Sequence, residues 1–303
     1  MTRTKPERPT PRDVSQRPAA DAFPLEPIDA RTWRSRTDPR FWNQIGPFGG
    51  WLAGLTMAAM RELAPPASAP RSLAVHYLAA APAGDLVLEG RVVREQRRVS
   101  GLRVELRGAQ EATASVVAEG VFGVSRPEAS AATLPPPHLP AAARLPRYTA
   151  LDPLAPFVKA FDYRIAAGEP FAGGGSSQSS GWLRPDLPYR PGPEWLLMLA
   201  DAWFPPAWAG RDGAVPVSTI SLQVVFHDCR DLCQDAEGFF RASFREESRA
   251  DGFGLERGEL WWPDGRLALT SQQLTWIGEG GRAPRAAQAS LEVTGRDATA
   301  AMA

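Results

Sequence analysis

Two stretches of this sequence are apolar on almost every face of a helix, and strand-like segments follow each of them. The first is WLAGLTMAAMREL at residues 51–63, and the second is EWLLMLADAW at residues 194–203. A pair of consecutive prolines shortly after each stretch predicts where the helix ends. A helix without a polar face is stable only when other parts of the protein enclose it. The fold therefore has to provide a wrapping surface for two helices.

The strand-like segments can provide that surface, because they are rich in Val and Leu, alternate roughly, and are bounded by Gly and Pro. In the first half we predict strands at residues 72–78, 85–95, 100–108 and 112–123. In the second half we predict strands at 161–165, 215–227, 238–250, 252–262 and 265–278, with a loop at 172–181 and a hairpin turn at 262–265. The predicted fold class is α+β, with one buried helix in a bent antiparallel sheet in each half.

Proline density sets the predicted domain organisation. Residues 126–157 are rich in proline and alanine, which disfavours helix and strand and predicts a semi-rigid linker. The linker separates an N-terminal domain at 28–125 from a C-terminal domain at 158–280. We expect residues 1–27 and 281–303 to be disordered tails, because their composition cannot bury a core.

The composition argues against several classes of function. The chain has 303 residues, and its 34 basic and 34 acidic residues leave no net charge, which argues against a nucleic-acid partner. We find no secretory signal pattern and no apolar run of membrane-helix length, so we expect a cytoplasmic protein with no membrane partner. Cys229 and Cys233 are the only cysteines, and they predict ordinary thiols rather than a disulfide framework or a metal site.

Several motifs follow one another in order over roughly residues 40–278. In the first half they are GPFGGW at 46–51, SLAVHYL at 72–78 and RVVREQRRVSGLRVEL at 91–106. In the second half they are GWLRP at 181–185, LADAWFPP at 199–206, STISLQVVFH at 218–227 and DGRLALTSQQ at 264–273. Together they resemble the acyl-CoA thioesterase II family. The resemblance implies a double hotdog, in which two bent antiparallel sheets each wrap a long helix.

The same resemblance implies hydrolysis of an acyl-CoA or acyl-carrier thioester, with no metal or redox cofactor. Two features of the first half depart from the family pattern. The strand at 72–78 commonly closes with an Arg-Pro pair, whereas three alanines follow it here. A polar residue common at the end of the third strand is also replaced, around residues 106–108. These changes affect the expected substrate more than the expected catalytic residues.

By resemblance, an aspartate, a threonine and a glutamine of the second half hold the attacking water. They fall on Asp201, Thr219 and Gln272, with Gln273 as the rival of Gln272 and Ser221 as the fallback for Thr219.

Asp201 also stands out on physical grounds. It lies in the last turn of an apolar helix, where both the helix dipole and burial disfavour a carboxylate. An aspartate in an apolar site has a raised pKa, which suits a general base. The alternative is a structural aspartate that an arginine or a backbone amide satisfies.

The two other residues have weaker independent support. Gln272 shares a strand face with Leu274 and Trp276, which predicts that it is buried and hydrogen-bonded. Gln273 lies on the opposite face and fits a surface glutamine better. Thr219 lies on the strand face opposite the apolar one, although threonine is common in strands for structural reasons alone.

Three further residues are predicted to bind substrate. Gly49 and Gly50 lie where the first helix begins, and N–H groups at a helix start can polarise a carbonyl; helix-start glycines can equally serve geometry alone. Arg98 belongs to an arginine-rich hairpin at 91–103 that could meet the phosphates of coenzyme A. The alternative for the hairpin is a solvated face partnered by glutamates.

We therefore expect an acyl-CoA or acyl-carrier thioesterase whose partner is its small-molecule substrate. The sequence has no GxSxG motif, which argues against an α/β-hydrolase. A protein that binds acyl thioesters without turnover is the first alternative. A hydratase or dehydratase is the second, but it would need a catalytic histidine that neither helix supplies. Oligomers are common in this fold, so a homo-oligomer such as a two-fold dimer is compatible with the resemblance.

Overall fold

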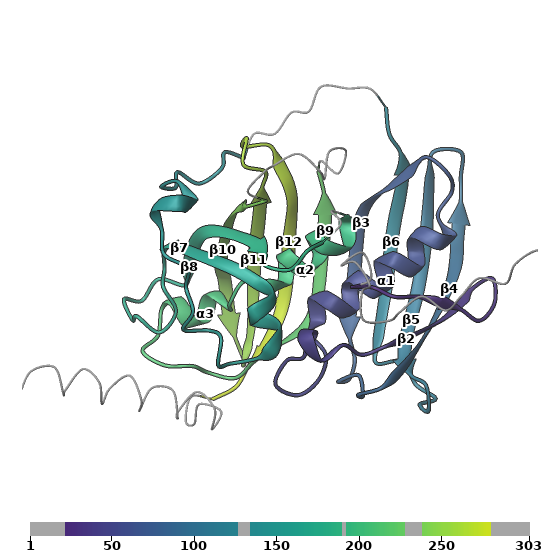
Figure 1. The fold of residues 1–303 in the computed structure, drawn as a ribbon, viewed down its shortest axis with the longest axis horizontal. Coiled ribbons are helices and arrows are strands. Elements are labelled where there is room, and N and C mark those ends of the chain that lie inside the picture. Colours follow the sequence, from purple (N-terminus) through teal and green to yellow (C-terminus); the bar gives the residue numbers. More distant parts are fainter. Residues whose placement is uncertain (1–21, 127–133, 190–191, 228–237, 280–303) are drawn as a thin grey trace, which may run out of the picture.

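The computed structural model describes residues 22–126, 134–189, 192–227 and 238–279. Most of the two predicted tails, part of the predicted linker, and both Cys229 and Cys233 lie outside these ranges. Within them, one 12-stranded antiparallel sheet curves around two central helices (Figure 1).

The elements follow the predicted plan. The first half contains β1 (Glu26–Pro27), β2 (Thr32–Arg36), η3 (Pro39–Phe41), α1 (Gly49–Leu63), β3 (Ser68–Tyr77), β4 (Asp85–Glu95), β5 (Val99–Gly108) and β6 (Val116–Val124). The second half contains η4 (Ala142–Arg144), η5 (Pro156–Ala160), β7 (Phe161–Ala167), β8 (Gln178–Pro185), α2 (Pro193–Ala202), α3 (Pro206–Ala209), β9 (Val217–Phe226), β10 (Phe240–Ala250), β11 (Phe253–Trp261) and β12 (Leu267–Ile277).

The two halves share one sheet, so the prediction of two separate sheets is wrong in this respect. The strand order is β1-β2-β4-β5-β6-β3-β9-β12-β11-β10-β8-β7. β3 and β9 pair at the centre, with Ser72 opposite Val225 and His76 opposite Ser221. Each is the first long strand after its helix, and each would otherwise be an open sheet edge. Pairing them removes two unpaired edges, which is the physical reason to join the halves.

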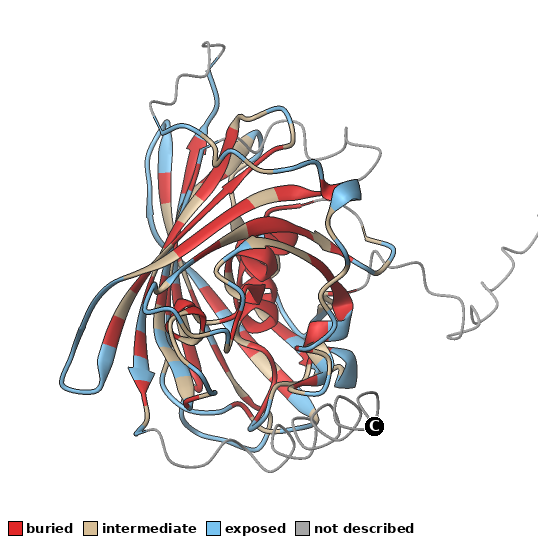
Figure 2. Ribbon diagram, turned by 90° about the vertical axis from the view of Figure 1, so that its left-hand side faces the viewer, coloured by how far each residue is buried: buried red, intermediate tan, exposed pale blue. Residues whose placement is uncertain are grey.

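The helices lie antiparallel against each other inside the sheet. Arg61, in the last turn of α1, pairs at 2.7 Å with Glu194, in the first turn of α2. At the other end, Gly50 of α1 lies against Asp201 of α2. Figure 2 shows the buried residues gathered on the helices and on the concave face of the sheet. The apolar character of both helices is thus explained, because each is enclosed by sheet and by the other helix.

The sequence missed three strands. β1 and β2 are short, and β8 begins inside the segment that we predicted as a glycine- and serine-rich loop. Gly181 in β8 is required by packing, because a Cβ atom there would lie 2.1 Å from the carbonyl oxygen of Arg164 on β7. The glycine thus permits close strand pairing rather than a loop.

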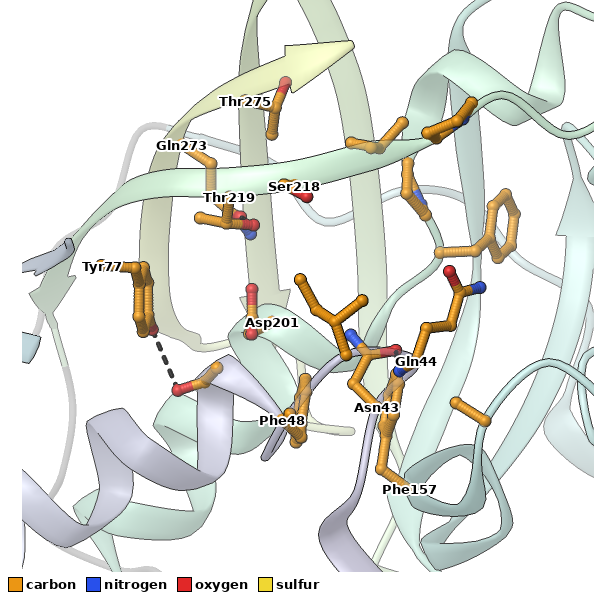
Figure 3. A pocket seen from close by; sticks show the side chains of 18 of the residues that line it. Asn43, Gln44, Phe48, Tyr77, Phe157, Asp201, Ser218, Thr219, Gln273 and Thr275 are labelled. Atoms are coloured by element: carbon orange, nitrogen blue, oxygen red, sulfur yellow. Dashed lines mark hydrogen bonds between the residues drawn. The ribbon is translucent and has the colours of Figure 1, made fainter. Parts of the chain in front are cut away.

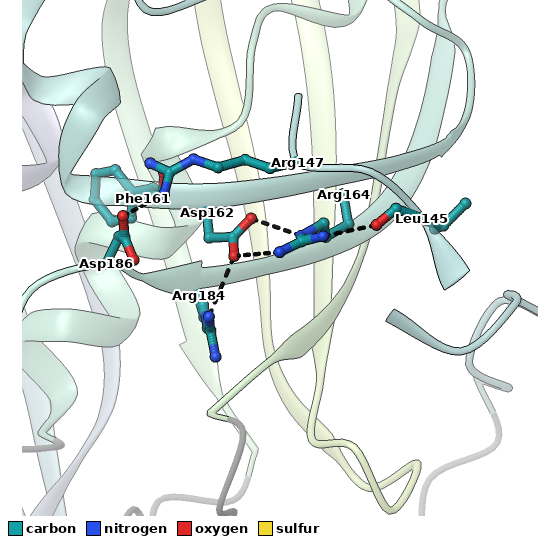
Figure 4. Close-up of polar contacts among 7 residues, drawn as sticks. All are labelled: Leu145, Arg147, Phe161, Asp162, Arg164, Arg184 and Asp186. Carbon is teal, nitrogen blue, oxygen red and sulfur yellow. Dashed lines mark hydrogen bonds and ion pairs between the residues drawn. The ribbon is translucent and has the colours of Figure 1, made fainter. Parts of the chain in front are cut away.

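Part of the predicted linker is packed against the second half. Asp162 on β7 is 1% exposed and pairs with Arg164 and Arg184, while Arg164 also donates to the carbonyl oxygen of Leu145 at 2.7 Å (Figure 4). Arg147 pairs with Asp186 in the same region. These charge-assisted contacts hold residues 145–147 on the edge formed by β7 and β8. The domain bounds themselves stay a prediction.

The end of the predicted N-terminal tail also contacts the core. Trp51 donates its indole N–H to the carbonyl oxygen of Ala22 at 2.7 Å, and the ring of Phe23 lies 5.8 Å from that of Trp195. Residues 22 and 23 therefore pack on both helices.

No helix in the described ranges is both long and apolar enough to cross a membrane.

Residues 158–280 expressed alone should not remain a folded monomer. The fragment would expose the edge of β9 and the apolar face of α2 that α1 covers, so it should aggregate or pair with itself. Sedimentation velocity of the fragment beside the full chain measures this. A monomeric fragment with a cooperative unfolding transition would contradict the shared core.

Candidate active site

A cavity of about 550 Å³ opens between the start of α1, the end of α2 and the concave face of the sheet (Figure 3). Its polar wall includes Tyr77 from the first half and Asp201, Thr219 and Gln273 from the second. Aromatic side chains form much of the remaining wall: Phe48, Phe157, Tyr163, Trp203, Phe204 and Trp208. Phe48 and Phe157 stack with their ring centres 4.1 Å apart. The cavity is thus mostly apolar, with a few convergent polar groups, as small-molecule sites generally are.

Asp201 occupies the last turn of α2, as predicted, and its carboxylate faces the cavity. The side chain is enclosed by protein on its other sides, and this burial raises the pKa of Asp201 to about 7. Hydrogen bonds from the backbone N–H of Gly50 and the side chain of Gln273 favour the charged form and partly oppose the shift. Asp201 can therefore hold or release a proton near neutral pH.

The start of α1 provides the favourable electrostatic environment that Asp201 lacks at the end of its own helix. The C-terminal end of α2 carries a negative partial charge that disfavours Asp201, whereas the N-terminal end of α1 carries a positive one. A Cβ atom on Gly49 would lie 2.9 Å from Oδ2 of Asp201, so only glycine allows this approach. The predicted Gly49 lines the cavity, and the predicted Gly50 donates its N–H to the carboxylate.

Tyr77 fixes this helix start from the sheet side. Its hydroxyl donates to the carbonyl oxygen of Gly49 at 2.9 Å (Figure 3). Burial, and then the nearby charge of Asp201, hold the pKa of Tyr77 well above its ordinary value, so the phenol stays protonated. We did not predict Tyr77 as a site residue, although it lies in the motif SLAVHYL.

Thr219 and Gln273 form a hydrogen-bonded pair beside Asp201. Thr219 Oγ1 donates to Gln273 Oε1 at 2.8 Å, and Gln273 Nε2 lies 3.5 Å from the carbonyl oxygen of Ala200 on α2. A register shift explains how Thr219 reaches the cavity. On β12, Leu274 lies opposite Ser221 but Thr275 lies opposite Thr219, so Ile220 is an extra residue on β9. This bulge reverses the alternation of β9 and turns Thr219 inward.

Gln272, the predicted glutamine, does not line the cavity, and its rival Gln273 does. The expectation that Gln272 is the buried glutamine is wrong, because Gln272 shares its face with Leu274 and Trp276, which we took as buried. Those side chains are 39% and 42% exposed, so their face of β12 is the outer one at Gln272, although Trp276 at the end of the strand also borders the cavity. Gln273 lies on the inner face and is 8% exposed.

The fallback residue Ser221 and the predicted substrate residue Arg98 also lie away from the cavity. Ser221 lies opposite the exposed Leu274. The carbonyl oxygen of Arg98 accepts from Val124, which pairs with Ser68 at the far end of β3 from Tyr77. A ten-residue strand spans roughly 30 Å. The structure thus places Arg98 near one end of β3 and the cavity at the other end of that strand.

A second buried acid, Glu256 on β11, also borders the cavity and was not among the predicted residues. The sequence feature that could have pointed to Glu256 is its position as a lone acid between Gly254 and Gly258 on one face of the strand. In the described ranges no three His, Cys, Asp or Glu side chains are grouped so that they could hold a metal ion.

Replacing Asp201 with asparagine should stabilise the fold in a pH-dependent way. A carboxyl with a folded-state pKa of about 7 and an ordinary value of 3.8 destabilises the folded state progressively as pH rises between these values. The free energy of unfolding of Asp201→Asn should therefore match that of wild type near pH 4. Near pH 8 it should be higher, by on the order of 4 kcal/mol at most. Guanidinium unfolding at both pH values measures the difference. A difference independent of pH would contradict the raised pKa.

Comparison with known proteins matches this chain to two family models. The model of the acyl-CoA thioesterase N-terminal domain matches residues 38–123, and that of the acyl-CoA thioesterase C-terminal domain matches residues 131–277. No curated protein matches the chain.

Solved structures show the same fold. A hot dog fold protein of unknown function from Alicyclobacillus acidocaldarius is 26% identical, with a TM-score of 0.75 over 87% of this chain and 97% of that one. A putative thioesterase II from Thermobifida fusca is 19% identical, with a TM-score of 0.75 over 86% and 97%. An acyl-CoA thioesterase II from Mycobacterium marinum is 18% identical, with a TM-score of 0.68 over 88% and 99%. The fold is a hotdog fold, and the two domain models together show that this chain belongs to the acyl-CoA thioesterase family.

Proposed function

We propose that this protein is a double hotdog enzyme that hydrolyses an acyl-CoA thioester with a water molecule activated by Asp201. The observation that carries the proposal is a carboxyl with a pKa of about 7 that faces an apolar cavity at the start of a helix. A general base works best when its pKa lies near the working pH. Membership of the thioesterase family supports thioester hydrolysis in general.

In the proposed reaction, Asp201 removes a proton from water as the water oxygen attacks the thioester carbonyl carbon. Thr219 and Gln273, already joined by a 2.8 Å hydrogen bond, orient the water from the sheet side. The tetrahedral intermediate then breaks its carbon–sulfur bond, and the proton held by Asp201 passes to the departing thiolate. The products are a carboxylic acid and a free thiol, and the base is regenerated.

The start of α1 would stabilise the negative oxygen of that intermediate. Trp51 and Leu52 donate their N–H groups to the carbonyl oxygen of Phe48, and Gly50 donates to Asp201. Of the first four N–H groups of the helix, this leaves that of Gly49 for the substrate. Each half thus contributes: the second supplies the base, and the first supplies the oxyanion donor.

Two alternatives fit less well. A hydratase or dehydratase needs a histidine at the site, and none of the three histidines of this chain lines the cavity. A dehydratase structure with a TM-score of 0.52 and 12% identity reflects the shared fold alone. A protein that only binds acyl thioesters has no need of a buried acid poised near neutral pH.

Asp201→Asn should lower thioester hydrolysis by about 10² to 10⁴, because asparagine cannot take the proton. In wild type, kcat/KM should rise with pH until about pH 7 and then level, as Asp201 ionises. Release of free thiol from acyl-CoA substrates, followed at several pH values, measures both. A normal rate per folded Asp201→Asn molecule would exclude Asp201 as the base.

Alanine variants of the neighbouring Gln273 and Gln272 provide a test and its matched control. Gln273→Ala should lower kcat about tenfold or more, since it removes the partner of Thr219 and a contact to Asp201. Gln272→Ala changes the next residue, on the outer face, and should leave kcat within about twofold. If Gln272→Ala proves the more damaging of the two, the proposed site is wrong.

A further inference from the structure

The proposed mechanism does not use Glu256, although this acid borders the same cavity. It lies on the concave face of β11, opposite Gln273 on β12 and opposite Glu246 on β10. The side chain is 6% exposed, and its Oε1 atom has no hydrogen-bond partner. Among the described residues it forms no ion pair. A buried, unpaired carboxyl is costly and needs an explanation.

The surroundings of Glu256 favour its protonated form. Burial, then the negative charges of Glu246 and Asp201, raise the pKa of Glu256 to about 8, and a hydrogen bond with Thr275 opposes the shift only in part. A protonated carboxyl offers one O–H donor and a carbonyl acceptor. The terminal bond of a glutamate side chain rotates over a broad range, so either oxygen can turn toward the cavity.

Trp203 carries a second polar atom without a partner. Its indole Nε1 is buried and makes no hydrogen bond, and the residue lines the same cavity. Its ring stacks on Phe244 at 5.7 Å between centres. The ring of Phe244 in turn fills the space beside Gly258, two positions along the same strand face from Glu256. Trp203 and Glu256 therefore each line one mostly apolar cavity and each carry a buried polar atom without a partner, which a turn of the side chain would present to a ligand.

We propose that Glu256 and Trp203 form a polar subsite that binds an oxygen on the acyl chain, so that the preferred substrates are acyl thioesters carrying a hydroxyl or keto group. This rests on the proposed thioesterase function. An unsubstituted chain would cover both groups without giving either a hydrogen bond, whereas an oxygenated chain would pair them. Sites built to bond a polar substituent reject the analogue that lacks it.

The position of Glu256 favours the acyl chain over the amide groups of the pantetheine arm. Among the large apolar lining residues, the most exposed are Ile45 at 77% and Leu78 at 63%, on the first-half side of the cavity, ahead of Trp276 at 42% and Ile220 at 37%. From β3 on that side, the inner wall runs across β9 and β12 to β11. Glu256 therefore lies one strand beyond Gln273, about 4.8 Å farther inside. The coenzyme arm stays nearer the opening, and the first carbons of the acyl chain reach Glu256.

The test compares octanoyl-CoA with β-hydroxyoctanoyl-CoA and β-oxooctanoyl-CoA in thiol release. Wild type should favour at least one oxygenated substrate by about tenfold in kcat/KM. Glu256→Leu should abolish this preference while keeping or improving turnover of octanoyl-CoA, and Glu256→Gln, which keeps a donor and an acceptor, should retain part of it. Leucine should not unfold the protein, because an apolar group then replaces an unpaired polar one; the melting temperature checks this.

Two outcomes of the kinetic comparison would overturn the subsite. One is a wild-type enzyme that treats all three substrates alike. The other is a Glu256→Leu variant that loses the same factor on each, since that would place the contact on the shared coenzyme arm. Calorimetric binding of the three compounds to Asp201→Asn separates the subsite from the proposed reaction. Tighter binding of an oxygenated compound, without thiol release by wild type, would refute the thioesterase proposal and keep the subsite; equal binding would refute the subsite itself.

Discussion

The antiparallel contact between α1 and α2 sets the position of the groups at the site. Each helix is too apolar to face water, so each covers the other inside the curved sheet. Antiparallel packing brings the N-terminal end of α1 to the C-terminal end of α2, where Asp201 lies. A carboxylate that its own helix disfavours thereby meets the N–H groups and the positive end of its neighbour. At the opposite end, Arg61 and Glu194 hold the same pair in place.

The shared sheet joins the two halves that carry these helices. Because β3 pairs with β9, Tyr77 and Thr219 lie on neighbouring strands and face the cavity from the two halves. Tyr77 fixes the first turn of α1, and Thr219 fixes Gln273. The site is therefore built across the junction between the halves, and neither half contains it alone. The bulge at Ile220 also contributes to the site, because regular alternation along β9 would turn Thr219 away from the cavity.

Regular elements were predictable because hydrophobic periodicity reports which face is buried. Both helices and most long strands appear near their predicted bounds, and Asp201 was identifiable as an acid in an apolar helix. The failures have particular causes. Gln272 was preferred over Gln273 because Leu274 and Trp276 were assumed to be buried, and exposed apolar residues on an outer strand face break that rule. Glu256 and Tyr77 act through neighbours far away in sequence, which local patterns do not report. Arg98 was chosen for its charge alone, which carries no information about distance from the cavity.

We infer that the junction of the two helices holds Asp201 as an acid that titrates near neutral pH. Carbon NMR of the aspartate carboxyl groups, with Asp201→Asn used to assign the signal, measures this directly. We expect a midpoint near pH 7 for Asp201 in the free protein. A midpoint near the ordinary value of 3.8 would mean that the carboxylate is already stabilised as a permanent charge, and the proposed role of Asp201 as a base poised near neutral pH would be wrong.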